Sequence, residues 1–308
     1  MSALNEVTGH ARQELAKAIV GQREPIDLLL LTVVCGGHAL LEGVPGLAKT
    51  LAVRSLATIL RLQFHRVQCT PDLMPADIIG SNVFNLSSSS FTLHKGPVFT
   101  DLLLVDEINR MPPRTQAALL EAMEERQVTI DGVSHRLPDS FATFATQNPV
   151  EFEGTYPLPE AQVDRFMTRL SLGYPSAGAE VAMLRAHEGG DRVEDVEPVA
   201  GAADLLLVQD AARRVYASDA LRTYVVSLLA RTREDTRVEL GASPRAGLLL
   251  LRAAKARALL HGRDHALVDD VQALATVVLA HRIVLAPEAM DITGERVVAD
   301  ALATTPAL

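Results

Sequence analysis

The sequence predicts an α/β domain with a phosphate-binding turn, followed by an all-helical domain. The first observation is the stretch Gly43-Val44-Pro45-Gly46-Leu47-Ala48-Lys49-Thr50, a glycine-containing turn between an apolar run and a helical pattern. The second is a strongly apolar run that ends in the carboxylate pair Asp106-Glu107. The third is that strand patterns stop near Pro175, after which only helical patterns follow. These observations predict an α/β domain over residues 1–175 and a helical domain over residues 176–308.

The composition is that of a globular protein with room for two domains. The chain has 308 residues, of which 48% are apolar, so it can build a substantial core. Its formal charge of −9 argues against non-specific binding to nucleic acid, because such binding neutralises phosphates. Aromatic residues make up only 4% and Trp is absent, which argues against a platform for stacking bases. We therefore expect no nucleic-acid partner.

Cysteine usage and the apolar runs favour a cytoplasmic protein. Cys35 and Cys69 have no metal-ligand spacing and are expected to be free, buried thiols; a structural disulfide between them is the alternative that their number allows. Residues 1–6 lack the basic flank and apolar core of a signal peptide. The apolar run over residues 25–35 is too short to cross a bilayer and contains Asp27. No membrane insertion is expected.

Two helical patterns precede the phosphate-binding turn. Apolar residues recur at helical spacing over residues 8–19, and the apolar run over 25–36 predicts a buried helix. Val20 and Gly21 separate the two patterns. One interpretation is that Val20 and Gly21 fold back onto the base of a nucleotide. A plain turn in the core explains them equally well.

The turn has the residue types of a P-loop that binds ATP. Backbone N–H groups in such a turn, together with the positive end of the following helix, surround a polyphosphate. Lys49 would place its charge on the β/γ-phosphates, and Thr50 would place its hydroxyl on Mg²⁺. The predicted ATP-binding residues are Gly43, Val44, Pro45, Gly46, Leu47, Ala48, Lys49, Thr50 and Leu51, with Val20 and Gly21 at the base.

One residue departs from the generic P-loop pattern G-x-x-x-x-G-K-[ST]. Ala48 stands where that pattern has its second glycine. Alanine is acceptable there if the local backbone is already helical, because only a positive φ demands glycine. The alternative is an ordinary strand-to-helix turn that happens to contain Lys-Thr.

Further strands and two β-hairpins are expected after the P-loop helix. Alternating residues predict a strand over 62–68, and a short helix is expected over 73–79. Two alternating runs within 83–94 surround a serine-rich turn and predict a hairpin, and an Asp-Gly turn predicts a second hairpin over 128–134. The remaining predicted elements are core strands within 97–107, 141–146 and 169–173 and a helix over 113–126.

Polar side chains at the ends of the core strands are the candidate catalytic residues. Asp106 would hold Mg²⁺, and Glu107 would orient and activate the attacking water. Asn148 ends the next core strand and would hydrogen-bond the same water or the γ-phosphate. The alternatives are a polar exit from the core for Asp106-Glu107 and a common Asn-Pro turn for Asn148.

Two arginines are candidates for contacts with phosphate. Arg165 follows a short helix that begins at Pro159-Glu160, and it would reach a neighbouring subunit's phosphate as an arginine finger. The alternative is a surface pair between Asp164 and Arg165. Arg245 begins a helix, where a cation is unexpected because helix N-termini favour anions, so it is a second candidate.

The helical domain contains five helical patterns. They cover residues 178–188, 204–217, 219–233, 244–261 and 268–281. The fourth has the most specific boundaries, with Ser243 as an N-cap, Pro244 at the first helical position and Gly262 after its end.

Taken together, four motifs resemble the MoxR family of AAA+ ATPases. They are the turn at 43–50, Val105-Asp106-Glu107-Ile108-Asn109-Arg110, Ala145-Thr146-Gln147-Asn148-Pro149 and the stretch 158–166, which reads LPEAQVDRF. The resemblance runs from about Val20 through the helical domain, and Ala48 in the turn is itself a feature of that family. It implies an AAA+ core with a five-stranded parallel sheet and inserted hairpins, followed by an all-α lid. It also implies Walker A at 43–50, Walker B at Asp106-Glu107, sensor 1 at Asn148, the arginine finger at Arg165 and sensor 2 at Arg245.

The same resemblance implies a function. Such proteins are ring-forming ATPases, expected here as a homo-hexamer that uses ATP and Mg²⁺ and has chaperone-like activity on protein clients. Metal or cofactor insertion and complex assembly are the implied tasks, with a von Willebrand factor A domain protein as the implied type of partner. Hairpins of this kind usually face the channel of the ring. Insert-bearing relatives can have a displaced lid, which leaves open whether Arg245 acts in its own subunit or the next.

Two other functions remain as alternatives. A nucleic-acid-remodelling motor is one, because related insert-bearing rings include helicase-type proteins; the acidic composition opposes it. A non-hydrolysing nucleotide switch is the other, and it would require Glu107 or Arg165 to be misplaced.

Overall fold

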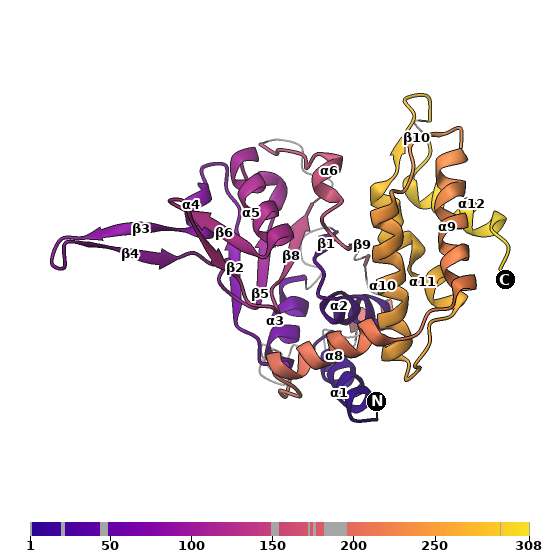
Figure 1. The fold of residues 1–308 in the computed structure, drawn as a ribbon, viewed down its shortest axis with the longest axis horizontal. Coiled ribbons are helices and arrows are strands. Elements are labelled where there is room, and N and C mark those ends of the chain that lie inside the picture. The colour runs from indigo at the N-terminus through magenta and orange to yellow at the C-terminus, as the bar shows by residue number, and fades with distance from the viewer. Residues whose placement is uncertain are drawn as a thin grey trace.

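The computed structural model describes residues 2–19, 22–43, 49–148, 154–171, 173–174, 177–181, 196–289 and 291–307. An α/β body and a group of lid helices stand side by side, and one β-hairpin projects far from the body (Figure 1). The predicted division at 175/176 and the predicted base contacts Val20 and Gly21 lie outside the described residues.

A five-stranded parallel sheet forms the centre of the α/β body. Its strand order is β2 (Phe64–Gln68), β5 (Leu102–Asp106), β8 (Ala142–Gln147), β1 (Ala39–Glu42) and β9 (Thr168–Ser171). All neighbouring strands in this sheet pair in parallel. This arrangement confirms the predicted sheet. Every strand therefore begins at one edge of the sheet, the amino edge, and ends at the other, the carboxyl edge.

Helices cover both faces of the sheet, because parallel strands are apolar on both sides. Strand β5 is buried along its whole length, as its sequence predicts. On one face the core joins the sheet to α1 (Ser2–Ala18), α2 (Arg23–Val34), α3 (Lys49–Ile59) and the lid. On the other face a second core joins it to α4 (Pro75–Ile79) and α5 (Pro113–Glu125).

Both predicted hairpins are present. Strands β3 (Gly80–Asn85) and β4 (Ser90–Lys95) form the projecting hairpin of Figure 1. Strands β6 (Gln127–Ile130) and β7 (Val133–Arg136) form the second. In its turn Asp131 and Gly132 both have positive φ, at 49° and 80°, which is the backbone that an Asp-Gly turn favours.

The lid is helical, with one small addition that the sequence did not predict. Its helices are α8 (Ala202–Arg214), α9 (Asp219–Glu234), α10 (Pro244–Leu260), α11 (Val268–Leu279) and α12 (Gly294–Thr304). The addition is an antiparallel pair formed by β10 (Val238–Leu240) and β11 (Val284–Leu285). Helix α12 was also not predicted. At the start of α10, Ser243 accepts a hydrogen bond from the Ala246 N–H at 3.2 Å, so the predicted N-cap is confirmed.

Two further expectations concern cysteines and membranes. Cys35 and Cys69 are both buried and unpaired, as predicted. Within the described part of the chain, the helices are too short or too polar to cross a membrane.

Candidate functional site

The first predicted site residue, Lys49, lies at the carboxyl edge of the sheet. It begins α3, and its Nζ donates a hydrogen bond to the carbonyl oxygen of Gly43 at 2.7 Å. Partial burial lowers the pKa of Lys49, whereas the charges of Asp106, Glu107 and Glu42 act to raise it. The ammonium therefore sits where the ends of β1 and β5 place their carboxylates. Thr50 follows Lys49 in the same helical turn, and predicted residues 44–48 lie outside the described residues.

Asp106 ends β5 and is almost completely buried, with 6% of its surface exposed. One carboxylate oxygen accepts a hydrogen bond from Arg66 Nε at 2.6 Å, and the other accepts one from the Thr146 hydroxyl at 3.2 Å. Arg66 belongs to the neighbouring strand β2, and Thr146 to the neighbouring strand β8. Adjacent strands therefore fix both oxygens of Asp106.

Glu107 occupies an unusual backbone position directly after β5. Its φ of 59° and ψ of 53° place it in the left-handed region, which is uncommon for a residue with a side chain. The Thr146 hydroxyl accepts the Glu107 N–H at 2.9 Å, while Gln68 Nε2 donates to the Glu107 carboxylate at 2.9 Å. Arg110 forms an ion pair with the same carboxylate at 3.1 Å. Strained backbone held by several contacts is common at active sites.

Asn148 lies at the same edge of the sheet. It directly follows β8, and the preceding residue Gln147 pairs with Glu42 at the end of β1. Asn148 is nearly buried, with 9% of its surface exposed. The structure therefore brings Lys49, Asp106, Glu107 and Asn148 to one edge, as the sequence predicts for the ends of parallel strands.

The donor atoms at this edge suit Mg²⁺ bound together with a polyphosphate. Mg²⁺ prefers oxygen ligands and commonly takes only one or two carboxylates, with water and phosphate oxygens completing its shell. The buried Asp106 carboxylate and the Thr50 hydroxyl offer oxygen atoms of this kind. Among the described residues, clusters of three or more His, Cys, Asp or Glu side chains that would hold a metal without phosphate are absent.

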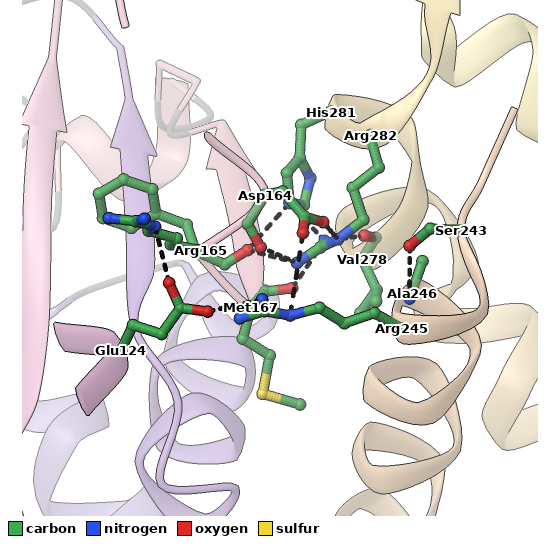
Figure 2. Close-up of polar contacts among 11 residues, drawn as sticks. Glu124, Asp164, Arg165, Met167, Ser243, Arg245, Ala246, Val278, His281 and Arg282 are labelled. Carbon is green, nitrogen blue, oxygen red and sulfur yellow. Dashed lines mark hydrogen bonds and ion pairs between the residues drawn. The ribbon is translucent and has the colours of Figure 1, made fainter. Parts of the chain in front are cut away.

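Arg165 and Arg245 lie elsewhere, where they share one carboxylate. Arg165 Nε is 3.1 Å from one oxygen of Glu124, and Arg245 Nη1 donates to the other oxygen at 2.8 Å (Figure 2). The hydrogen bond from Arg245 and the charges of both arginines lower the pKa of Glu124. Glu124 belongs to the last turn of α5 and Arg245 to the first turn of α10. This arginine pair therefore bridges the α/β body and the lid.

The arginine pair stands at the amino edge of the sheet. Arg165 comes three residues before β9, and the Met167 N–H donates to the carbonyl oxygen of His38, the residue before β1. The His38 ring likewise lies 3.1 Å from the carbonyl oxygen of Met123, which neighbours Glu124. Gly43, whose carbonyl oxygen Lys49 contacts, instead follows the other end of β1. Four strand residues separate the two edges, which is roughly 13 Å.

Asp164 does not form the surface pair with Arg165 that was the alternative to an arginine finger. Its carboxylate instead accepts a hydrogen bond at 2.7 Å from Arg282, a nearly buried arginine of the lid. Arg245 Nε is 3.8 Å from the second oxygen of Asp164. Neighbouring residues thus point to different partners, Asp164 to the lid and Arg165 to α5.

Sequence reasoning missed several residues of both edges. At the carboxyl edge these are Arg66, Gln68 and Thr146. Arg66 and Gln68 alternate on β2, and their polarity beside the apolar β5 was the available signal. At the amino edge the missed residues are Glu124 and Arg282, which are distant in sequence from the arginine finger and carried no such signal.

Comparison with protein families gives two matches. Residues 38–168 match the ATPase family associated with various cellular activities (AAA), and residues 230–301 match the AAA lid domain. The two matches cover four of the five strands of the sheet, with their strand-end residues, and most of the lid.

Individual relatives match over nearly the whole chain. Chaperone MoxR1 of Mycobacterium tuberculosis is 41% identical, with 94% of this chain and 80% of the relative aligned. Protein MoxR of Methylorubrum extorquens is 34% identical over 89% of this chain and 87% of its own. A solved structure from Cytophaga hutchinsonii, described as a candidate ATPase, is 40% identical with a TM-score of 0.92. That comparison covers 99% of this chain and 96% of the other.

Proposed function

This chain belongs to the MoxR family of AAA+ ATPases, and on that premise we propose that it is an Mg²⁺-dependent ATPase that works as a ring. In the proposed ring each active site combines the carboxyl edge of one subunit with the amino edge of the next. ATP hydrolysis then drives chaperone-like remodelling of protein clients.

One observation supports this proposal above all others. Lys49, Asp106 and Glu107 lie at the carboxyl edge of the sheet, while Arg165 and Arg245 are gathered on Glu124 at the amino edge. A single chain therefore carries both halves of a phosphoryl-transfer site with a strand length between them. A second copy of the chain can supply the missing half, as arginine fingers do in trans.

The residues of the carboxyl edge have distinct proposed roles. Lys49 holds the β/γ-phosphates as a point charge, and Asn148 hydrogen-bonds the γ-phosphate or the attacking water. Glu107 accepts a proton from that water, and Gln68 and Arg110 hold its carboxylate in place. Thr50 and Asp106 would hold Mg²⁺, which neutralises developing charge on the phosphates when it is bound.

The residues of the amino edge act on the neighbour. Arg165 stabilises the charge that develops on the transferred phosphoryl group, and Arg245 contributes a second cation. In this chain their charges are balanced by Glu124. When the arginines bind a neighbour's phosphates, they exchange the Glu124 carboxylate for phosphate oxygens. The free-energy cost of moving the arginines is therefore small.

The projecting hairpin is the proposed contact with clients. Its exposed apolar side chains are Val83, Phe84, Leu86 and Phe91. The rings of Phe84 and Phe91 stack edge to face across the two strands, 5.2 Å apart. Lys95 is the only Lys or Arg in residues 80–95, so this surface suits an extended polypeptide more than a nucleic-acid backbone. We further propose a hexamer, a cytoplasmic location and a von Willebrand factor A domain partner, from the family relationship alone.

The Glu107→Gln variant tests the hydrolysis. It keeps the shape of the side chain and its contact with Gln68 but removes the proton acceptor. We expect it to bind ATP with wild-type affinity and to lose about 10³-fold or more in turnover. ATP binding is measured by fluorescence and turnover by phosphate release. Turnover near the wild-type rate would refute the assignment of Glu107.

Subunit mixing tests the trans arrangement. Arg165→Ala subunits keep an intact carboxyl edge, and Glu107→Gln subunits keep an intact amino edge. A mixture should therefore hydrolyse ATP faster than either variant alone, because some interfaces join the two intact halves. A mixture no faster than its components would contradict catalysis in trans. In ATP, the tagged Glu107→Gln protein should also retain clients for identification.

A further inference from the structure

Arg282 of the lid forms hydrogen bonds with the segment that carries the arginine finger. It ends the short helix η3 (Ala280–Arg282), and only 2% of its side chain is exposed. Its guanidinium donates to the carbonyl oxygen of Asp164 at 2.9 Å, to that of Phe166 at 2.7 Å and to the Asp164 carboxylate at 2.7 Å (Figure 2). The two carbonyl groups stand on either side of Arg165. One lid side chain therefore fixes the main chain before and after the finger.

A neighbouring histidine contacts the same segment. His281 is also buried, and its Nε2 lies 3.0 Å from the Phe166 carbonyl oxygen. Burial and the nearby charge of Arg282 lower the pKa of His281 well below its usual value, so the ring is neutral, and the same Nε2 also contacts Arg282 Nη1. The Phe166 carbonyl oxygen thus accepts a hydrogen bond from Arg282 and also contacts the preceding lid residue.

The contacts make use of features that only arginine has. A guanidinium carries five N–H donors in a rigid plane, so it bonds two carbonyls and a carboxylate at once, whereas a lysine ammonium is a single point with three donors. On one side Arg282 borders an open cleft between α6 (Glu160–Val163) and the lid. This cleft is lined by residues such as Ala161, Leu240 and Val284. On that side, polar contacts rather than close packing hold the finger segment to the lid.

A second lid arginine provides a contrast. Arg237 is held by two carboxylates, with Nη2 at 2.6 Å from Asp235 and 3.0 Å from Asp300. Both of those partners belong to the lid. Arg282 instead reaches across the domain boundary to the residues around Arg165. Arg237 therefore stabilises the lid alone, whereas Arg282 connects the lid to the segment that carries Arg165.

We propose that Arg282 is a positioning residue for Arg165, and that it makes the orientation of the lid in one subunit set the position of the finger offered to the next. This inference rests on the proposed role of Arg165 in trans. Arg245 begins a helix of the same lid and approaches Asp164 and Glu124 as well. A change in lid orientation therefore moves the finger segment and the second arginine together.

The first test compares Arg282→Gln with the matched control Arg237→Gln. Arg282→Gln should lower kcat by about 10- to 100-fold, because a displacement of about 1 Å at a catalytic group costs on that order. Its affinity for ATP should stay within about twofold, since the P-loop of the same subunit is intact. Arg237→Gln should keep both quantities within about twofold. A folded Arg282→Gln protein with the kcat of the control would overturn the proposal.

Mixing experiments separate positioning from a loss of folding. Arg282→Gln subunits mixed with Glu107→Gln subunits should regain turnover, as Arg165→Ala subunits do, because the second subunit type supplies a correctly held finger. If Arg165→Ala regains turnover and Arg282→Gln does not, positioning by Arg282 is wrong while the proposed function stands. If neither regains turnover, the trans role of Arg165 fails and the inference fails with it.

A conservative variant covers the case in which Arg282→Gln does not fold. Arg282→Lys keeps a charge for Asp164 but cannot bond the carbonyls on both sides of Arg165. We expect a fall in kcat of about three- to tenfold with unchanged ATP affinity. Wild-type kcat in the folded lysine variant would show that the planar guanidinium and its several N–H donors are not needed. That result would overturn the proposal.

Discussion

The two edges of the central sheet are built in different ways. At the carboxyl edge the chemical groups follow their strands directly: Asp106 ends β5, Glu107 comes next, and Asn148 follows β8. At the amino edge the groups come from a loop, from α5 and from the lid, and they meet through ion pairs on Glu124 and Asp164. The first edge belongs to one rigid element, whereas the second exists only while two domains keep their relative orientation.

This difference suggests a division of labour. A site fixed by adjacent parallel strands suits tight and constant binding of nucleotide. A site that bridges two domains suits a catalytic contribution that changes with conformation. The relative orientation of two domains changes more easily than the arrangement of adjacent strands in one sheet. ATP affinity should therefore respond to changes at the carboxyl edge, whereas changes at the amino edge should affect turnover alone.

The largest effect is expected from Lys49→Ala. Loss of this charge should weaken ATP binding by on the order of 100-fold or abolish it, because charge-assisted contacts with phosphate are lost. Arg165→Ala should leave ATP affinity within about threefold and reduce only turnover. Titration with a fluorescent ATP analogue measures both. The exposed Lys17, which pairs with Glu14, provides Lys17→Ala as a control. If Lys49→Ala and Arg165→Ala weakened ATP binding equally, the proposed difference between the two edges would be wrong.

The next effect concerns Arg245 in the lid. Arg245→Ala should lower kcat by about 30- to 100-fold if the arginine reaches a neighbour's phosphate, and Arg245→Lys should recover part of that loss. Arg231→Ala is the control, since Arg231 forms an exposed pair with Glu234 within α9. Phosphate release at saturating ATP is the measurement. If kcat is unchanged while ATP affinity drops, Arg245 serves the nucleotide of its own subunit instead.

A smaller effect is expected from acid, and it should act at the amino edge. Burial lowers the pKa of His38 to about 3, and burial also lowers the pKa of His281. Unfolded histidine binds a proton near its ordinary value of 6.5, which the folded protein resists, so stability is lost as pH falls below that value. The loss should be about 1.4 kcal/mol per pH unit for each such histidine.

Urea unfolding between pH 7.5 and 5 measures this loss. The window lies above the ordinary pKa of carboxyl groups, so histidines dominate it. His38→Gln should reduce the slope of stability against pH, although it lowers stability at neutral pH by removing the bonds of His38 to Met123 and Thr143. Stability that stays flat down to pH 5 in the unmutated protein would contradict neutral, buried histidines at this edge.

The smallest effect is expected at Arg66. This half-exposed arginine donates to Asp106 at 2.6 Å, so it competes with Mg²⁺ for the same carboxylate. Arg66→Ala should lower the Mg²⁺ concentration needed for half-maximal ATP binding by roughly two- to fivefold, since exposed pairs are weak. An increased Mg²⁺ requirement would instead make Arg66 a support for Asp106 that the metal needs.

The sequence alone was sufficient to predict one edge of the sheet and most of the fold. Apolar strands, the Asp-Gly hairpin turn and the Ser243-Pro244 helix start are local signals, and the structure shows each of them. Asp106 and Glu107 were predictable because strand ends in a parallel sheet converge, so adjacency in the chain translates into adjacency in space. The small ribbon of β10 and β11 escaped prediction because its strands are very short and far apart in the chain.

Only the tertiary structure decided the arrangement of the other edge. Nothing local connects Arg165 with Glu124, or Asp164 with Arg282, because these contacts join residues separated by about forty and by more than one hundred positions. Charged side chains acquire specific partners only when packing removes water and places the partners at hydrogen-bonding distance. The sequence determined which residues are able to handle phosphate. Packing between the domains determined that Arg165 and Arg245 meet on Glu124 at the amino edge.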